Sequence, residues 1–478
     1  MPMRTYRISW CVALCVAMFA LQGASAQLRS SYFMRGSYFR TELNPALAPT
    51  RGYIAVPGMS GVGVNVTSNF LSVENLYQSV GDGYVSIFDN SISNEDALSR
   101  FTDDARLNLS ANVNVIGLGF YSKRTYWNVG LNSRVQGSAT FSNSLFSSMK
   151  GSSVAESGSL DASGFLEAYL GTSFYVHKNV NIGIRVKALF GAMNIAGDIN
   201  TGTRLGDTYR LNGTYTLSGM FMRDIDPELA VVYDKSEVYD MKVGNILKSP
   251  LNAGFAADLG AEVRLFKERF KISASVVDLG FISWNAKSAK SYNVTADFPL
   301  SDSSLDGLAN IGKTELKYSG AQGVASENMR KMLQGSFNIG LEYNFLYDYM
   351  SVGLLSHNVF YDKKIRSSEL TASLNIRPTN WITATVSKTL FMGDNFGIFG
   401  VALNVHPRAI NIFVGADFID AKSVKTSKGT TLFLRPVSRS VYAGVGFNFT
   451  RPQHIRLASA QAKAERREAR ELRKEAKN

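Results

Sequence analysis

The four histidines are the first residues to consider as catalytic groups, because histidine is a frequent general base at neutral pH. His177 and His406 fall in predicted tight turns, His357 in a predicted strand and His454 near the C-terminus. A nucleophilic site needs a nucleophile, a base and an orienting group within reach of one another, and no serine near His357 in the sequence suggests such a partner. No set of His, Asp and Glu has the spacing of metal ligands, and no glycine-rich stretch resembles a phosphate-binding loop. The sequence therefore predicts no enzymatic activity, no metal and no cofactor.

Ionisable residues recur instead at alternate positions of predicted strands, on the face opposite the apolar side chains. They are Glu167, Arg185, Lys187, Asp258, Glu262, Arg264, Lys271, Glu342 and Asp417. Mixed charges of this kind commonly fill a wet interior with salt bridges, and the functional alternative is a lined path for a solute. Tyr169, Tyr175 and Phe413 lie on the same face. This face is therefore not purely polar, and we expect these three residues to line a ligand path.

Long amphipathic strands carry these residues. From Trp127 to Phe141 every odd position is apolar or small and every even position is polar or glycine, and the run from Leu107 to Val115 alternates in the same way. The strand pattern is interrupted only at residues 122–125, and aromatic residues flank this predicted turn. A long hairpin with one apolar face and aromatics near its turn is typical of a transmembrane β-barrel. A soluble sandwich is the alternative, but its turns would recur every 8–12 residues or so, and these hairpins are about 35 residues long.

The same alternation through residues 51–450 predicts an all-β, transmembrane antiparallel β-barrel of about 14 strands, or 16 if residues 208–220 and 228–240 add a hairpin. The predicted short turns lie near residues 122–125, 177–179, 266–269, 347–350, 378–380 and 406–408. The predicted long connections include residues 142–163, 196–250, 285–334 and 420–438. Outer-membrane barrels have short periplasmic turns and long outer loops. The sequence thus predicts an integral outer-membrane protein whose mature N- and C-termini are periplasmic.

The first 26 residues have the pattern of a secretory signal peptide. Arg4 and Arg7 precede the mostly apolar residues 8–21, and small residues lead to a cleavage site after Ala26. An uncleaved anchor is the alternative, but the apolar run is short for a span of ~20 residues. Both cysteines lie in this stretch, so we expect no disulfide, zinc-thiolate site or cysteine nucleophile in the mature chain.

Residues 27–50 are not strand-like. Within them, Asn44, Pro45 and Ala46 interrupt regular structure, because a proline disfavours helix for the residue before it. We interpret residues 27–50 as an N-terminal plug segment inside or beneath the barrel, and we expect Asn44–Ala46 to border the ligand path.

The C-terminal residues 451–478 differ from the rest of the chain. They hold nine Lys or Arg and four Glu, and much of the formal charge of +12 therefore lies here. Residues 458–477 are rich in good helix formers. Nucleic acid is the usual partner of a basic tail, but an exported protein seldom meets it, and none is predicted. Two readings stay open: a solvated tail, or a basic periplasmic helix that docks on the acidic cell wall or a periplasmic partner.

The apolar alternation slips by one residue at two places. At Val115 and Ile116 it changes from odd to even positions, and at Val276 and Val277 it changes back. A one-residue slip inside a strand predicts a β-bulge, which bends the strand and interrupts pairing. Such bulges serve barrel closure, and they can also open a lateral gap in the wall.

Short motifs at Leu43–Ala46 and Asp278–Trp284, with an echo of the second at Asp258–Gly260, give the chain a resemblance to a known family. It resembles a group of Gram-negative outer-membrane barrels of unassigned function and, more remotely, FadL-type fatty-acid transporters and PorV-like secretion proteins. This resemblance implies a 14-stranded barrel with an N-terminal plug and, by analogy, passage of hydrophobic molecules. The tail departs from the pattern, because a barrel chain usually ends with an aromatic residue and here 29 residues follow Phe449.

We therefore expect transport of small hydrophobic molecules across the outer membrane, with membrane lipid and a hydrophobic ligand as partners. The alternative is a non-transporting scaffold or secretion-system partner, for which the long outer loops and the basic tail would make the contacts.

Overall fold

The computed structural model describes residues 29–449 with gaps. The gaps are residues 58, 81–82, 90, 101–103, 150, 152–153, 207, 220–250, 300–314, 325–327, 346–347, 362–363, 393–396, 419–422, 426–430 and 434–437. The predicted signal peptide, residues 1–26, and the predicted tail, residues 451–478, lie outside the described residues.

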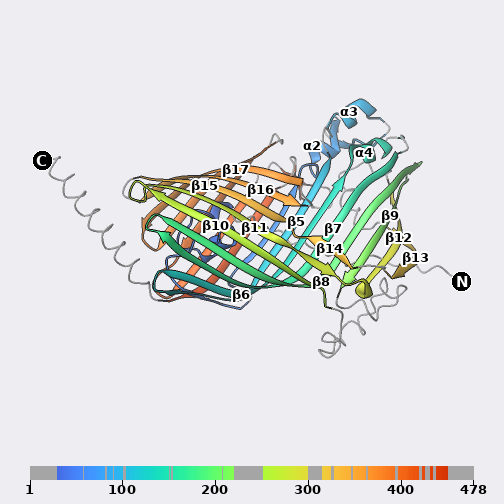
Figure 1. Ribbon diagram of the computed structural model, residues 1–478. Coiled ribbons are helices and arrows are strands. Elements are labelled where there is room, and N and C mark those ends of the chain that lie inside the picture. The colour runs from blue at the N-terminus through green and yellow to red at the C-terminus, as the bar shows by residue number, and fades with distance from the viewer. Residues whose placement is uncertain are drawn as a thin grey trace.

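A closed antiparallel barrel of 14 strands forms the body of the protein (Figure 1), which confirms the predicted fold class. Its first strand has two pieces, β1 (Tyr53–Ala55) and β2 (Val62–Ser68). The other wall strands are β5 (Ala105–Ser122), β6 (Thr125–Phe141), β7 (Val154–His177), β8 (Val180–Leu205), β10 (Ala253–Leu265), β11 (Phe270–Trp284), β15 (Gly335–Phe345), β16 (Met350–Tyr361), β17 (Lys364–Thr379), β18 (Ile382–Phe391), β19 (Gly397–Val405), β20 (Ile410–Phe418) and β23 (Ser438–Asn448). The barrel closes because β23 and β5 both pair with β1 and with β2.

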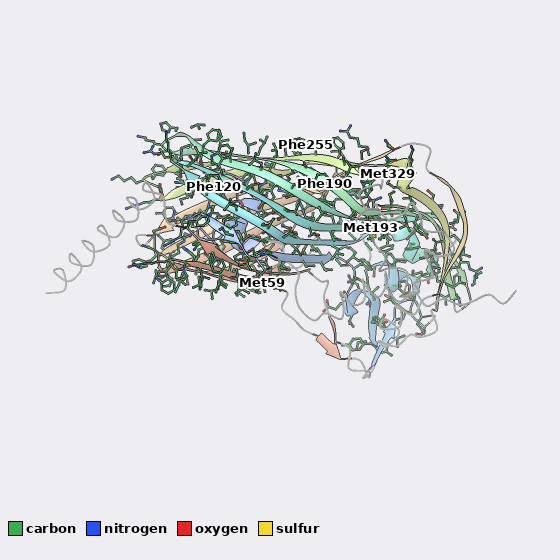
Figure 2. All side chains as sticks on the ribbon, turned by 90° about the horizontal axis from the view of Figure 1, so that it is seen from below. Met59, Phe120, Phe190, Met193, Phe255 and Met329 are labelled. Atoms are coloured by element: carbon green, nitrogen blue, oxygen red, sulfur yellow. The ribbon has the colours of Figure 1, made fainter. Side chains whose placement is uncertain are left out.

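Strand β6 illustrates why these sequences form a barrel wall. Val129 and Val135 are 42% and 37% exposed, whereas Asn128 and Asn132, at even positions of the same strand, are buried. Polar side chains inside and apolar side chains outside are the reverse of a water-soluble protein, and they suit a wall that faces lipid. Figure 2 shows Phe190 and Phe255 projecting from the outer surface of this wall. Backbone pairing all round the barrel leaves no open sheet edge in the wall.

The two ends of the barrel differ. At one end, which we call the turn end, consecutive wall strands are joined by short turns, such as residues 123–124 between β5 and β6 and residues 178–179 between β7 and β8. At the other end, the extension end, strands β7 and β8 reach well beyond the closed barrel (Figure 1). β23 ends at the turn end, because Phe449 donates its N–H to the carbonyl of Gly52, just before β1.

The extension is built on a change of partner along β8. β8 pairs with β10 up to Phe190 and with β9 from Met193 onward. β9 (Thr208–Gly219) pairs in turn with β12 (Ala289–Pro299), and β12 pairs with β13 (Glu315–Val324). Parts of the long connections expected at 142–163, 196–250 and 285–334 are thus strands. Residues 208–219 extend the sheet outside the wall, so the wall has 14 strands and not 16. Residues 228–240 lie outside the described residues.

A small cap lies at the extension end (Figure 1). It consists of α2 (Val73–Leu76), β3 (Tyr77–Val80), β4 (Gly83–Ser86), α3 (Asn94–Leu98) and α4 (Asn143–Met149). Ser72 and Ser93 cap α2 and α3 by accepting hydrogen bonds from the backbone N–H groups of Asn75 and Asp96. Apolar side chains form its core, namely Val73, Leu76, Tyr77, Ile87, Ile92, Ala97, Ala105 and Phe146. The remaining short elements are η3 (Ala286–Ser288), β14 (Met329–Met332), β21 (Ser423–Lys425) and β22 (Thr431–Phe433).

Residues 29–50, which we call the inner segment, run between the walls of the barrel (dark blue in Figure 1). They contain two 3₁₀ helices, η1 (Arg29–Ser31) and η2 (Tyr38–Glu42), and η1 contacts β18, β19 and β20. Tyr32, Phe33 and Met34, between the two helices, are at most 3% exposed. Among the described residues, no helix has the length and apolarity needed to cross a membrane.

Candidate functional site

The interior of the barrel contains a cavity of about 150 Å³, comparable to one that holds a benzene molecule. Phe39, Glu42 and Leu43 of the inner segment border it, and the other lining residues come mainly from the wall strands. Most of the lining side chains are amides, hydroxyls or charged groups. A second cavity of about 140 Å³ shares Thr67 and Asn108 with the first and reaches Met392, just past the end of β18 at the extension end.

Three polar contacts of Thr41 and Glu42 hold the end of η2 against the wall, on the side of the cavity that faces the turn end. Arg185 lies 3.5 Å from the carboxylate of Glu42 and donates a hydrogen bond of 2.9 Å to the hydroxyl of Thr41. Asn112 donates its side-chain amide to Glu42 over 3.3 Å. The inner segment therefore separates the cavity from the turn end, and two of these three contacts, both of Glu42, are longer than typical charge-assisted hydrogen bonds.

The two aspartates of the related Asp-Leu-Gly motifs meet at one lysine. The ammonium of Lys187 is 2.8 Å from Asp258 and 2.6 Å from Asp278, and its side chain is 1% exposed. Asp258 also accepts a hydrogen bond of 2.8 Å from the backbone N–H of Asp278. Two motifs that are 20 residues apart in the sequence thus form a single buried charge cluster beside the cavity.

Arg134 of β6 joins this cluster as a second cation and brings Glu167 of β7 into it. Its guanidinium donates two hydrogen bonds of 2.7 Å to the two oxygens of Asp278 and one of 2.6 Å to Glu167. Paired donors of this kind fix both distance and orientation. Because removing one partner of a buried ion pair leaves the other charge uncompensated, each of these residues is expected to be costly to change.

A bulge in β11 turns Asp278 inward. Ala257 pairs with Leu279 and Leu259 pairs with Val276, so Val277 and Asp278 together oppose the single residue Asp258. Asp278 has a φ of 62°, in the left-handed region that Asn and Asp tolerate better than most residues. The extra residue of β11 thus lies at or next to the predicted slip at Val276 and Val277.

A second irregularity lies where the first wall strand is broken. The pairing of β5 with β6 shifts between Asn114 and Ile116, which places the extra residue at Val115. Residues 56–61 interrupt the neighbouring β1–β2 strand here, and Met59 projects outward from this break (Figure 2). Tyr38 of the inner segment donates a hydrogen bond to the carbonyl of Ser60, so the inner segment lines the break from within.

Asn44, Pro45 and Ala46 of the inner segment fit against two paired glycines. Gly183 of β8 and Gly260 of β10 are directly opposite each other. A Cβ at Gly183 would overlap the carbonyl carbon of Pro45, and one at Gly260 would overlap the side-chain oxygen of Asn44. These positions thus require glycine for close approach of another backbone.

Asn44 also stabilises its own loop. Its side-chain oxygen accepts a hydrogen bond of 2.9 Å from the N–H of Ala46, and its amide donates to the carbonyl of Ala274 in β11 over 3.3 Å. The Asn-Pro-Ala sequence therefore forms a tight turn seated in a notch of the wall, below the cavity.

The three aromatic residues expected on the ligand path pack against other parts of the protein. Phe413 is 1% exposed and contacts the rings of Tyr38 and Phe39 at 5.3 and 5.0 Å between centroids. Tyr169 lies under the guanidinium of Arg185 at 4.7 Å, and Tyr175 lies under Arg264 at 5.2 Å. None of the three is among the lining residues of the two larger cavities in the described part of the chain.

A second charge cluster anchors the inner segment at the turn end. Arg35 donates hydrogen bonds of 2.7 Å to both oxygens of Asp348, in the turn between β15 and β16, and Arg377 lies 2.5 Å from Glu342. Burial acts to raise the pKa of the Asp348 carboxyl, but the nearby guanidinium groups of Arg35 and Arg377 outweigh it and hold that pKa below its usual value. Asp348 is therefore charged at neutral pH and holds Arg35.

Sequence patterns identified most of the inward charges but missed Arg134 and Asp278 as partners. The predicted inward residues Glu167, Lys187 and Asp258 are all at most 2% exposed and belong to the cluster. His357 is buried beside the cavity, with its ring Nδ1 2.5 Å from the side-chain oxygen of Asn338. In the described residues, no group of three or more His, Cys, Asp or Glu is placed to hold a metal ion.

Comparison with known proteins places this barrel in a family. A family model for DUF5723, a family of unknown function, matches residues 45–417. The chain belongs to this family. The match confirms the resemblance to a Gram-negative barrel family of unassigned function. No curated protein matches the chain.

Three solved structures with similar folds are distant in sequence. The toluene transporter TodX of P. putida shares 10% identity, with a TM-score of 0.42 over 89% of this chain and 96% of that one. The toluene transporter TbuX of Ralstonia pickettii shares 10% identity, with a TM-score of 0.40 over 89% and 95% of the two chains. A Pseudomonas aeruginosa FadL homologue shares 11%, with a TM-score of 0.38 over 89% and 97%. None of these likenesses is close enough to indicate what this outer-membrane barrel binds.

Proposed function

We propose that this protein is an outer-membrane channel for small molecules and that the inner segment is its plug. The observation that carries the proposal is the cavity between the inner segment and the extension end, which a second cavity prolongs toward that end. We take the extension end as the outer side and the turn end as the periplasmic side, because long outer loops and short periplasmic turns are usual in such barrels. A molecule entering from outside would then reach Phe39, Glu42 and Leu43 and stop there until the inner segment moves.

The lining of the cavity supports ligands that combine an apolar part with a neutral polar part. Phe39, Leu43 and Val277 offer apolar surface, which accords with the hydrophobic ligand expected from the sequence. Asn108 and Ser110 of β5 add amide and hydroxyl groups, whereas the charged groups of the cavity already neutralise one another. The usual small-molecule site is mostly apolar with a few polar groups, and the more polar lining of this cavity favours ligands that also carry a polar part.

A reversible tether tests whether the inner segment must move. The hydroxyls of Ser30 and Ser387 in β18 are 2.8 Å apart, so the double variant Ser30→Cys/Ser387→Cys should form a disulfide between the segment and the wall. Uptake of small aromatic alcohols and short fatty acids into proteoliposomes should fall at least about tenfold after oxidation, or ~1.4 kcal/mol. Reduction should restore it.

The matched control is a disulfide that stays within the wall. Thr371 of β17 and Thr389 of β18 have hydroxyls 2.7 Å apart and face each other in register. Oxidised Thr371→Cys/Thr389→Cys protein should transport at the wild-type rate. Equal uptake by the oxidised and reduced inner-segment variant would contradict the plug, and no uptake by wild-type protein for any of these solutes would contradict transport itself.

The ordered extension favours a second candidate, a scaffold that binds another protein outside the membrane. The cap has its own apolar core, and β7, β8, β9 and β12 form a continuous sheet beyond the wall. A photo-crosslinker at Leu205, which is 48% exposed near the end of β8, should then capture one partner in cells. If no crosslinked species forms there while uptake is normal, the scaffold is excluded and the channel remains.

A further inference from the structure

Exposed basic side chains gather at the turn end of the barrel. They occur in four short turns and comprise Lys123, Arg124, Lys178, Lys267, Arg269 and Arg408. We call these six residues the basic rim. The turns that carry them are neighbours around the barrel. The strands that these turns join lie in one continuous series of pairings, in the order β20, β23, β1, β5, β6, β7, β8, β10 and β11. The rim is therefore one arc of positive charge along the perimeter.

Acidic groups do little to offset this arc. Two acidic residues, Glu268 and Asp348, occur in the short turns of this end. This count covers the described residues of the four rim turns and of the two remaining short turns. Glu268 lies 3.5 Å from Arg264, and Asp348 is bound by Arg35. The chain also leaves the barrel at this end, beside Gly52, and residues 451–478 carry a net positive charge. The tail cannot neutralise the rim, so its counter-charge must come from outside the chain.

Each of three rim turns places a large apolar side chain next to its cations. Phe266, Val176 and Phe120 are 76%, 55% and 41% exposed, and each is within three residues of a rim cation. Phe120 lies toward the turn end of the outer surface (Figure 2). Cations bordering an exposed apolar surface are typical of side chains at the boundary between membrane hydrocarbon and headgroups.

The turn that carries Phe266 is strained. Phe266, Lys267 and Glu268 all have positive φ, at 51°, 57° and 67°. Three consecutive left-handed residues without glycine are unfavourable for L-amino acids, and such strain persists at sites where it serves a function. Here it holds the most exposed aromatic residue of the rim beside Lys267.

We propose that the basic rim binds the phosphate groups of anionic phospholipids in the membrane leaflet at the turn end. The rim follows the perimeter, where lipids surround the barrel, and it borders apolar side chains that would enter the hydrocarbon. An acidic protein or the cell wall would not account for these apolar neighbours. Attraction between basic residues and anionic headgroups is additive over residues close to the surface and is weakened by salt. The proposal does not depend on transport.

Lipid retention in nanodiscs tests this proposal on the full mature chain. Protein purified from nanodiscs with equal phosphatidylglycerol and phosphatidylcholine should retain phosphatidylglycerol in at least threefold excess by native mass spectrometry, and less in 1 M salt. Neutralising the rim by Lys→Gln and Arg→Gln at all six positions should abolish the excess. The matched control exchanges Lys for Arg and Arg for Lys at the same positions, which keeps every charge and should keep the excess.

Two outcomes would overturn the proposal. One is an unchanged lipid ratio in the neutralised variant, provided that it shows the heat-modifiable band of a folded barrel. The other is loss of the ratio on deletion of residues 451–478 alone, because the tail and not the rim would then be responsible. In the first case, co-sedimentation with purified cell-wall sacculi identifies the true partner. If the neutralised variant keeps its lipid ratio but no longer binds sacculi, the rim binds the cell wall and the lipid assignment is refuted.

Discussion

The two halves of the barrel interior are built from similar strands but are filled differently. Toward the turn end the inner segment meets the wall through closely fitted contacts, such as Asn44 and Pro45 against Gly183 and Gly260 and Arg35 against Asp348. Toward the extension end the wall side chains surround cavities. The boundary between the halves is η2, where Glu42 and Arg185 are 3.5 Å apart. The proposed plug thus fits closely against the wall toward the turn end and borders a cavity toward the extension end.

The charge cluster beside the cavity is part of the wall and does not depend on the inner segment. Arg134 of β6 and Lys187 of β8 both pair with Asp278 of β11. Two kinds of buried polar contact are therefore distinct: those that hold the barrel in shape and those that hold the inner segment in the barrel. Variants of each kind should affect different measurements.

The largest effect on stability is expected from Asp278→Asn. Asparagine tolerates the left-handed backbone of the bulge but removes the negative charge that pairs Arg134 and Lys187. Loss of one partner of a buried pair should lower the free energy of unfolding by about 3 kcal/mol. The midpoint of urea unfolding, followed by the heat-modifiable gel band, measures this change.

The control for that variant is an exposed pair with similar geometry. Arg210 donates to Asp297 over 2.7 Å, but its side chain is 42% exposed. Asp297→Asn should leave the midpoint of urea unfolding close to that of the wild type, because solvent screens an exposed pair. If both variants cost the same, burial is not what makes the lumen cluster important.

An intermediate effect, confined to the plug, is expected from Gly183→Ala. The added Cβ overlaps the backbone of Pro45, so the inner segment must lift from its notch. Trypsin should then cut after Arg35 and Arg40 about tenfold faster, which is ~1.4 kcal/mol in the opening equilibrium. The N-terminal peptides are counted by mass spectrometry in detergent-solubilised protein.

Gly164→Ala is the matched change for this experiment, because the nearest heavy atom to its Cβ would be 4.0 Å away. It should leave trypsin cleavage at the wild-type rate. Faster cleavage in both variants would mean that general weakening of the strands, and not the notch, releases the segment.

The smallest effect is expected from Glu42→Gln. The change weakens the contact of η2 with Arg185, which keeps Asp258 at 3.9 Å as a second partner. Solute uptake should rise about twofold to threefold, as for the loss of ~0.5 kcal/mol. Glu268→Gln breaks a pair of the same 3.5 Å length in an exposed turn and should leave uptake unchanged. A rise in both variants would refute a specific role for the edge of η2.

Sequence patterns predicted the wall well and the extension poorly. Alternation over residues 127–141 gave both the strand and the face that points outward, because lipid outside and water inside impose a period of two on every wall strand. Residues 154–163 and 196–205 were expected in loops, yet they continue β7 and β8. Their polar composition hides them, since strands outside the membrane need no apolar face toward lipid.

The candidate site divides in the same way. The phase slip at Val276 and Val277 lies next to the register shift in β11, where Val277 and Asp278 oppose Asp258, but the slip did not point to Asp278. The expected path through Tyr169, Tyr175 and Phe413 stays a prediction, because these residues pack against the inner segment or against arginines and not along the cavities. An inward direction alone does not distinguish a side chain that lines a cavity from one that another segment covers.

The sequence by itself determined the class of protein, narrowed the number of wall strands to about 14 or 16, and predicted most of the side chains that face inward, because these follow from a local period along the chain. Only the tertiary structure decided which of those side chains meet. Arg134 and Asp278, or Pro45 and Gly183, are brought together by strand register and by the course of the inner segment. Such contacts depend on relations between segments more than a hundred residues apart, and no local pattern records them.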